Sequence, residues 1–396
     1  MTKHQSKFEK LISKLCPRGV ELKNIVDIAS VTIGEFVHKN KQKSDGEYPV
    51  YNGGTSETGY YDEFNNTKDK IVISARGANA GYVNKIHKPF WAGNSCYTVD
   101  VVNKTLINWV YVYYYLKNNQ NKLIGEQQKG GIPAVSKKQV ENFKIPVPPL
   151  EIQDEIVKIL NKFTELEAEL EAGLEARKKQ YEYYRERLLS PDNKLVINYV
   201  SIKDIALDSF WIMPSTPPFV ADGEIPYITS KNIRKGHINF TDIKHISRED
   251  YLDISKNRPI IENDILISMI GTIGEVARVK KDDLEFYGQN MFLVRLNPSL
   301  INTNYFLHFF DSARMKLYFG SIKNNSGQGY LKSKHIDSIQ IPLPPLKDQE
   351  RIASTLDKFD TLVNDISIGL PAELNARRQQ YEYYRNKLLT FNEYVE

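Results

Sequence analysis

Two stretches of the sequence combine clustered positive charge with glycine and polar side chains. Residues 117–144 carry six lysines against two glutamates, and residues 314–335 carry five lysines or arginines and no aspartate or glutamate. Lysine and arginine contact phosphates, while glutamine, asparagine and serine reach base edges and glycine lets a backbone approach closely. The pattern indicates two DNA-binding loops, with a merely solvated loop as the alternative. The candidate residues are Gln128, Lys129, Lys137, Lys138, Lys323, Asn324, Asn325, Gln328, Tyr330, Lys332 and Lys334.

Other polar positions are weaker candidates for DNA contact. Short basic or glycine-rich segments contribute Lys39, Lys41, Lys43, Asn52, Lys231, Asn232, Arg234 and Lys235. Arg76, in SARGANAG, could grip a guanine with two hydrogen bonds, or could serve in an ion pair or a turn. Asn94, Gln289 and Asn290 precede expected strands at matching places, where they would read bases or form turns.

Catalytic motifs are missing. The sequence contains no GxxxxGK loop for nucleotide phosphates. Its Val-Pro-Pro-Leu and Leu-Pro-Pro-Leu segments lack the polar first residue and aromatic last residue of the adenine methyltransferase motif. Pro191-Asp192 and the later Asp242-Ile-Lys244 are too far apart for a nuclease pattern, and seven histidines and two cysteines never cluster at metal-ligand spacing. We therefore expect no enzyme activity, metal or cofactor on this chain.

Composition limits the class of protein. The chain has 396 residues, 41% of them hydrophobic, and a net charge of only +4. No apolar run approaches the 18 residues that a membrane-spanning helix needs, and the charged start lacks the apolar part of a signal peptide. These features favour a soluble, cytoplasmic protein of two or three domains.

An internal repeat supplies the elements that must position the loops. Residues 144–190 and 340–390 match each other, and both contain YEYYR, at 181–185 and 381–385. The offset is 196 residues at Phe163/Phe359 and 200 at Tyr181/Tyr381, so the second copy carries four additional residues. The upstream halves match only faintly. The chain therefore consists of two halves, each a mixed, mostly β module followed by a long helix.

Apolar residues in both helical segments alternate spacings of four and three, the heptad pattern of a coiled coil. Because one narrow apolar stripe cannot stabilise a long isolated helix, we expect the two helices to pack antiparallel within the chain; pairing with a second chain is the alternative. Four additional residues would lengthen the second helix while keeping the seam nearly in phase. The expected pairing residues are Ile156, Phe163, Leu170, Tyr181, Tyr184, Leu356, Phe359, Ile366, Tyr381 and Tyr384.

The order of these parts resembles the specificity subunits of type I restriction-modification systems. The resemblance lies in two variable modules, each followed by (V/L)PPL, a helix and the motif AR(K/R)(K/Q)QYEYYR. It implies an α+β chain with two target recognition domains separated by two antiparallel helices. Each domain would read one half of a split, asymmetric site on double-stranded DNA. The seam residues would also support the docking of partner subunits.

The resemblance also implies which partners carry the chemistry. Two adenine-N6 methyltransferase subunits would use S-adenosylmethionine, and up to two restriction subunits would use ATP and Mg²⁺. The leader SKFEKLISKLCPRGVEL would lie near the far end of the second helix. The expected segments are a leader (1–19), a first module (20–145), a central helix (146–190), a second module (191–340) and a C-terminal helix (341–396).

A competing hypothesis is a non-catalytic, bivalent scaffold that binds proteins or glycans. The paired basic loops favour DNA. A salt series distinguishes the two hypotheses, because DNA affinity must fall steeply with ionic strength.

Overall fold

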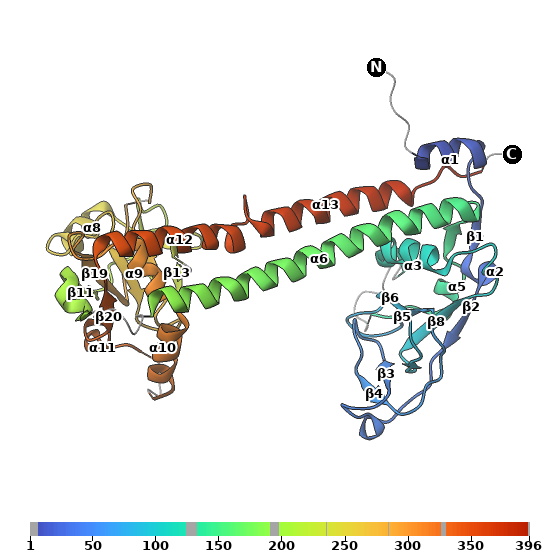
Figure 1. Ribbon diagram of the computed structural model, residues 1–396, viewed down its shortest axis with the longest axis horizontal. Coiled ribbons are helices and arrows are strands. Elements are labelled where there is room, and N and C mark those ends of the chain that lie inside the picture. Colours follow the sequence, from blue (N-terminus) through green and yellow to red (C-terminus); the bar gives the residue numbers. More distant parts are fainter. Residues whose placement is uncertain are drawn as a thin grey trace, which may run out of the picture. The chain divides into compact units, whose positions relative to one another are not determined.

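The chain folds into two compact units. The computed structural model describes residues 7–123, 133–190, 198–234, 236–283, 285–325 and 330–394, without the side chains of 323–325. Unit 1 comprises Met1–Glu169 and Leu374–Glu396, and unit 2 comprises Leu170–Glu373. The long helix α6 (Leu150–Leu189) contributes its first half to unit 1 and its second half to unit 2 (Figure 1).

Unit 1 is built on two small sheets. The first is antiparallel, in the order β2 (Ala29–Ile33), β8 (Cys96–Val101), β5 (Lys70–Ser74) and β6 (Val83–Ile86). The second has the order β4 (Gly59–Tyr61), β3 (Tyr48–Tyr51) and β7 (Trp91–Ala92), with β3 and β7 parallel. Strand β1 (Leu22–Asn24) pairs with β9 (Lys144–Pro146), which closes the module where the long helix begins.

Unit 2 repeats this topology. Its four-stranded sheet has the order β11 (Ala206–Ile212), β19 (Met291–Leu296), β16 (Ile265–Ser268) and β17 (Val276–Arg278). Its three-stranded sheet has β15 (Lys244–Ile246), β12 (Ile225–Thr229) and β18 (Tyr287–Gln289), and β10 (Asn198–Ser201) pairs with β20 (Gln340–Leu343). A short hairpin joins β13 (Ile233–Arg234) and β14 (His237–Ile238). The two modules thus share a fold although their sequences match poorly.

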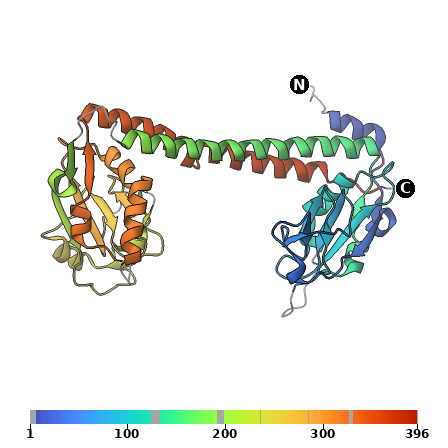
Figure 2. The ribbon, with the colours of Figure 1, turned by 60° about the horizontal axis from the view of Figure 1, so that its bottom comes forward.

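Short helices complete each unit. In unit 1 these are α1 (Lys7–Leu15), α2 (Ile25–Ile28), η1 (Lys39–Lys41), α3 (Trp109–Asn118), α4 (Gln120–Leu123) and α5 (Lys137–Glu141). In unit 2 they are α7 (Ile202–Ile205), η2 (Ser230–Asn232), α8 (Arg248–Ser255), α9 (Thr303–Phe310), α10 (Ala313–Asn325) and α11 (Ser333–Asp337). Figure 2 shows α9 and α10 beside the strands of unit 2.

A buried glutamine ties each long helix to its module. Gln153 accepts a hydrogen bond from the backbone N–H of Asn108 (2.9 Å), and its Nε2 donates to the carbonyls of Leu106 (3.0 Å) and Pro148 (2.7 Å). Gln349 makes the same three contacts in unit 2, with Asn302, Leu300 and Pro344. Helices α6 and α12 (Leu346–Asn364) begin directly after the paired prolines, which confirms the prolines as helix-entry signals.

The helices pair within the chain, as the heptad pattern predicts. In unit 1 the ring of Phe163 lies 6.0 Å from that of Tyr381 and 5.6 Å from that of Tyr384, and Arg378 of α13 (Leu370–Leu388) binds Glu167. Phe359 lies equivalently against Tyr181 (6.2 Å) and Tyr184 (5.6 Å) in unit 2. Within unit 1, Phe163 meets Tyr381, whereas Glu167, further along α6, meets Arg378, which lies earlier on α13, so the two helices run antiparallel there.

The seam also joins the module cores. Ile156 and Leu388 belong to the core cluster of unit 1, and Tyr181, Leu189 and Leu356 belong to that of unit 2. Each module therefore packs on the start of the helix that follows it and on the end of the other helix. Full burial of an isoleucine or leucine side chain stabilises a fold by about 1.5–3 kcal/mol, so these ends hold the helices firmly.

The second helix is interrupted, which corrects the prediction of one continuous C-terminal helix. Helix α12 ends at Asn364 and α13 begins at Leu370. The carboxylate of Asp365 accepts hydrogen bonds from the backbone N–H groups of Ser367 (2.7 Å) and Ile368 (3.2 Å), which compete with helical bonding. The additional residues therefore form a turn, and the prediction that Ile366 pairs the helices is wrong because its side chain is 78% exposed there.

Candidate DNA interface

Polar loops meet at one end of the sheets in unit 1. Since β5 and β8 run antiparallel, the end of β5 and the start of β8 lie at the same edge, and β3 and β7 run parallel toward it. Ala75 donates its N–H to the carbonyl of Ser95 (2.7 Å), and the Asn52 carboxamide accepts from the N–H of Ser95 (3.1 Å). Gly53 donates to Sγ of buried Cys96 (3.0 Å). Three loops that are distant in sequence are therefore fixed to one another.

The end of the predicted basic loop returns to the same edge. Gly77 donates to the carbonyl of Pro133 (2.9 Å), Val135 donates to that of Ala75 (2.9 Å), and Arg76 forms a β-bridge with Ala134. The side chain of Arg76 is exposed, and no ion pair joins it to another described residue. Its guanidinium is therefore available to a ligand at this edge.

Unit 2 brings the matching loops together. The Ser230 hydroxyl donates to the carbonyl of Asn290 and accepts from the N–H of Met269 (3.1 Å). Ile270 forms a β-bridge with Tyr330, as Arg76 does with Ala134 in unit 1. The predicted residues Gln289, Asn290, Tyr330 and Lys332 thus belong to one set of loops, which we call the unit 2 loop set.

Several predicted residues are exposed but lie beside these loops. Lys39 and Lys41 lie in η1, Lys231 in η2, Arg234 in β13, Lys137 and Lys138 in α5, and Lys334 in α11. Lys43 pairs with Asp62 (2.5 Å), and Lys137 pairs with Glu141 (3.3 Å). Exposed pairs of this kind are worth little, so a phosphate can displace them at small cost.

One predicted base reader is instead part of the internal framework. Asn232 is only 5% exposed; its Oδ1 accepts from the N–H of Thr229 (3.0 Å), and its Nδ2 donates to the carbonyl of Asn239 (3.0 Å). We correct that prediction, because a buried carboxamide whose oxygen and nitrogen both bond to the backbone of its own unit cannot reach a base. Asn52, which holds the turn at Ser95, likewise positions a loop. The structure places Asn94 beside that turn, half-buried.

Other predicted positions lie outside the described part of the chain: Gln128, Lys129, Lys235 and Gln328. Lys323, Asn324 and Asn325 fall at the end of α10, but their side chains are not described. Sequence reasoning missed Thr216 and Ser230, whose roles depend on contacts with Gln289 and Asn290 that no local spacing reveals.

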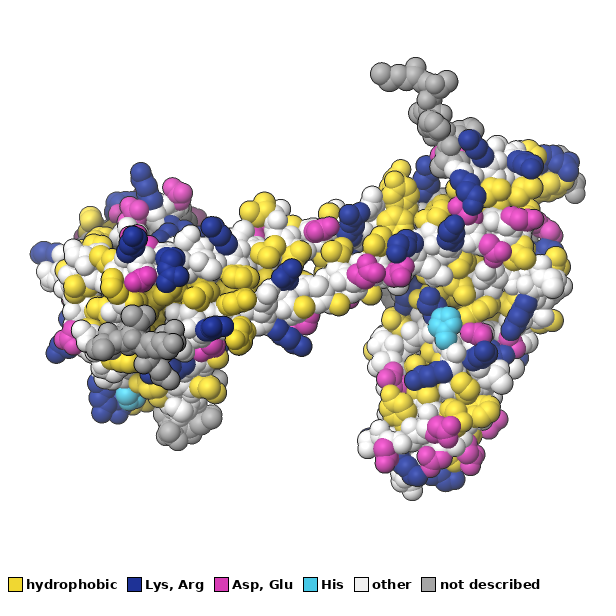
Figure 3. Space-filling model, in the orientation of Figure 1, with side chains coloured by type: hydrophobic (Ala, Val, Ile, Leu, Met, Phe, Trp, Pro, Cys, Tyr) yellow, Lys and Arg dark blue, Asp and Glu magenta, His cyan; other side chains and the backbone are white. Residues whose placement is uncertain are grey.

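Basic residues do not form one continuous patch on the visible face. In Figure 3 lysine and arginine side chains are interspersed with acidic ones, in keeping with a net charge of +4. A net charge this small gives the whole molecule only a weak attraction for DNA, so the local loops are the better candidates for DNA contact.

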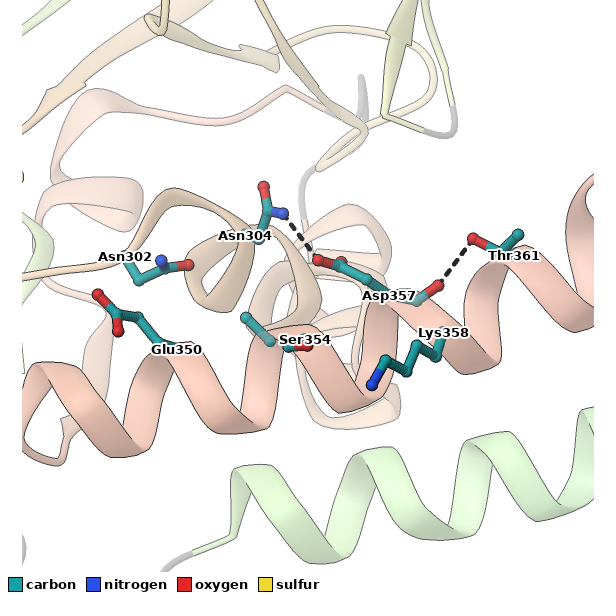
Figure 4. Close-up of a pocket in the computed structure, with 8 residues that line it drawn as sticks. Asn302, Asn304, Glu350, Ser354, Asp357, Lys358 and Thr361 are labelled. Carbon is teal, nitrogen blue, oxygen red and sulfur yellow. Dashed lines mark hydrogen bonds between the residues drawn. The ribbon is translucent and has the colours of Figure 1, made fainter.

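A shallow pocket opens in unit 2 where the start of α9 meets α12. It is lined by Asn302, Asn304, Glu350, Ala353, Ser354, Asp357, Lys358 and Thr361 (Figure 4). Asp357 accepts hydrogen bonds from Nδ2 of Asn304 (2.8 Å) and from the ring of His308 (2.7 Å). These contacts join α9 to α12, so the pocket belongs to the attachment of the helix and not to the loop set.

Across the described residues, no group of three or more histidine, cysteine, aspartate or glutamate side chains is arranged to hold a metal ion. Within the same part of the chain, no helix is long and apolar enough to cross a bilayer.

Comparisons with known proteins agree with this arrangement. A family model described as the type I restriction modification DNA specificity domain matches residues 17–177 and 198–376. A putative type I restriction enzyme specificity subunit of Haemophilus influenzae is 30% identical over 388 residues, which cover 94% of each chain. The EcoR124I/EcoR124II specificity subunit of Escherichia coli is 34% identical over 306 residues, 73% of this chain and 72% of the relative.

Solved structures show the same fold. A type I restriction-modification S subunit from M. genitalium has a TM-score of 0.57 at 18% identity, covering 93% of this chain and 96% of that chain. A chain from a structural study of complex assembly in a type I system has a TM-score of 0.60 at 15% identity, covering 94% of this chain and 98% of that chain. From the family match across both units, the chain belongs to the type I restriction-modification specificity subunits, and it is a DNA-recognition subunit and not an enzyme.

Proposed function

We propose that the two modules read the two halves of a bipartite, asymmetric DNA site. The observation that carries this proposal is the recurrence of one loop arrangement in both units, with different side chains in each. Exposed Arg76 occupies the bridge position in unit 1, where unit 2 has Ile270. A shared frame with different polar groups suits two readers of different base sequences.

The helices and the module attachments serve as the scaffold for partner subunits. Two adenine-N6 methyltransferase subunits and up to two restriction subunits would assemble on the chain, in keeping with the repeat of the helical motif. S-adenosylmethionine, ATP and Mg²⁺ would be bound by those partners. This chain would contribute recognition, and the methyl transfer would occur on an adenine that the partner reaches in or beside each half-site.

Module exchange tests the proposal. Residues 192–340 are replaced by the corresponding module of a related specificity subunit, and methylated adenines are mapped in cells that carry the methyltransferase subunit. We expect one half of the site to change while the other half and the gap between them stay the same. Simultaneous change of both halves would refute independent reading. The reciprocal exchange of residues 20–145 is the matched control.

A further inference from the structure

The backbone around Gln289 is held rigidly. Gln289 ends β18 and pairs with Thr229 of β12. The next residue, Asn290, has a left-handed backbone (φ 64°), which asparagine tolerates better than most residues. Its N–H donates to the carbonyl of Ile212 (2.9 Å), and its carbonyl accepts from the N–H of Met269 (3.2 Å). The backbone of Gln289 is therefore held in one position within the unit 2 loop set.

The Gln289 carboxamide is held from one side only. Its Oε1 accepts a hydrogen bond from the Thr216 hydroxyl at 2.8 Å and a longer one from the Tyr227 hydroxyl at 3.5 Å. Tyr227 is buried, and burial raises its pKa to about 12, so its hydroxyl stays protonated and able to donate. Nε2 makes no hydrogen bond to another described residue. The two hydroxyls use the two lone pairs of Oε1, and Gln289 is only half-buried, so the two N–H donors on Nε2 remain for a ligand.

We propose that Gln289 is a specificity-determining residue of unit 2, which recognises a hydrogen-bond acceptor on a base edge through Nε2. Thr216 and Tyr227 are positioning residues that fix the orientation of the carboxamide. The inference rests on the proposed function and names one reader within it.

The orientation has a consequence for base choice. A free glutamine pairs with adenine through two hydrogen bonds, which requires Oε1 to accept from the adenine N6 amino group. Here the hydroxyls of Thr216 and Tyr227 already bond to Oε1, so adenine could receive only the single bond from Nε2 to N7, and its N6 amino group would find no free acceptor. In the major groove guanine presents two acceptors and thymine one, whereas cytosine presents only an amino donor. Gln289 therefore favours guanine or thymine and excludes cytosine at its position.

Substitutions that keep the shape of the side chain test this inference. Methylated sites are mapped for the full chain with its methyltransferase partner, in wild type and in Gln289→Glu. The substitution replaces donors with acceptors, so the preference at one position of the unit 2 half-site should move toward cytosine or adenine, by about tenfold. Thr216→Val frees Oε1 and should admit adenine at the same position. Gln340→Glu makes the same chemical change on exposed β20 and should leave both half-sites unchanged.

The outcomes separate the inference from the proposed function. An unchanged unit 2 half-site in Gln289→Glu overturns the role of Gln289, and a shift toward guanine overturns the donor assignment. If Gln289→Glu abolishes methylation, Gln289→Ala decides: relaxed choice at a single position supports the inference, and unchanged choice overturns it. Failure of the exchange of residues 192–340 to alter the site would instead refute reading by unit 2 altogether.

Discussion

The final arginine of each YEYYR motif meets a different environment in the two units. Arg185 is buried, pairs with Asp311 and Glu182, and lies 4.8 Å over the ring of Tyr181. Arg385 lies similarly over Tyr381 (5.2 Å) but donates to the side chain of Asn118 (2.7 Å), next to Lys117. Among the described residues, the arginine of the motif is therefore ion-paired in unit 2 and hydrogen-bonded to a neutral side chain in unit 1, where Lys387 pairs with Glu9 instead.

We expect the contact between α13 and α3 in unit 1, where Arg385 meets Asn118, to respond to pH through the neighbouring Lys117. Burial, followed by the charge of Arg385, lowers the pKa of Lys117 to about 8. Because the unfolded pKa is higher, about 10.4, the protonated lysine destabilises unit 1 below pH 8, and this cost fades as pH rises through 8 toward 10. We predict that Lys117→Met raises the thermal unfolding temperature at pH 7 relative to wild type, with a smaller difference at pH 10. A constant difference between pH 7 and 10 would show that titration of Lys117 plays no part.

The exposed lysines of unit 2 should supply affinity and not sequence choice. Each phosphate contact contributes about 0.9 to the slope of log affinity against log salt. We predict that Lys332→Gln with Lys334→Gln reduces the slope by about two and leaves the methylated sequence unchanged. Binding to a labelled duplex across a salt series measures this. The matched control, Lys203→Gln with Lys347→Gln, removes two exposed lysines outside the unit 2 loop set, and an equal loss of slope there would exclude a specific role for Lys332 and Lys334.

At the scale of elements, an aromatic seam joins the paired helices in each unit. Phe163→Asp would place a charge against Tyr381 and Tyr384, and we predict that it destabilises unit 1 by about 3 kcal/mol or more. Denaturant unfolding measures the loss. Val102→Asp is the control, since Val102 is 76% exposed and the same change there should cost less than about 0.5 kcal/mol. Equal effects at both positions would contradict a packed seam.

Because helix α6 is uninterrupted, a change in its length tests whether it sets the spacing between the two half-sites. Four residues add about 6 Å and about 40° beyond one turn, while a base pair adds about 3.4 Å and about 35°. We predict that duplicating residues 168–171 lengthens the gap between half-sites by about one base pair and leaves both half-sites unchanged. Mapping of methylated sites checks the gap. An active variant with an unaltered gap would show that α6 does not set the spacing.

The turn at residues 365–369 shows where sequence reasoning reached its limit for helices. Heptad spacing predicted Phe163, Tyr181, Phe359 and Tyr381 correctly, because seam contacts follow from period alone. It failed at Ile366, because the local hydrogen bonds of Asp365 override the apolar period. The four additional residues of the second repeat therefore do not lengthen its helix as counting predicted, because the helix is interrupted between Asn364 and Leu370.

For the whole molecule, the repeat predicted two modules and paired helices, but not the loop sets. The parallel pairs β3–β7 and β12–β18 bring distant segments to one sheet edge, and strand order is not written in local spacing. Asn232 shows how this limits prediction from sequence. Its residue type and position suited a contact with a base, but its hydrogen bonds with Thr229 and Asn239 hold its side chain inside the fold. Residue type is therefore a weak guide to which side chains face a ligand.

The central claim is that this chain alone dictates which split DNA site is methylated. Base-resolution mapping of N6-methyladenine in cells with and without the gene tests it most directly, with the methyltransferase partner expressed in both. The account predicts one asymmetric motif of two short specific parts separated by a gap of fixed length, present with the gene and absent without it. Persistence of that motif after deletion, or a contiguous motif without a gap, would contradict the account.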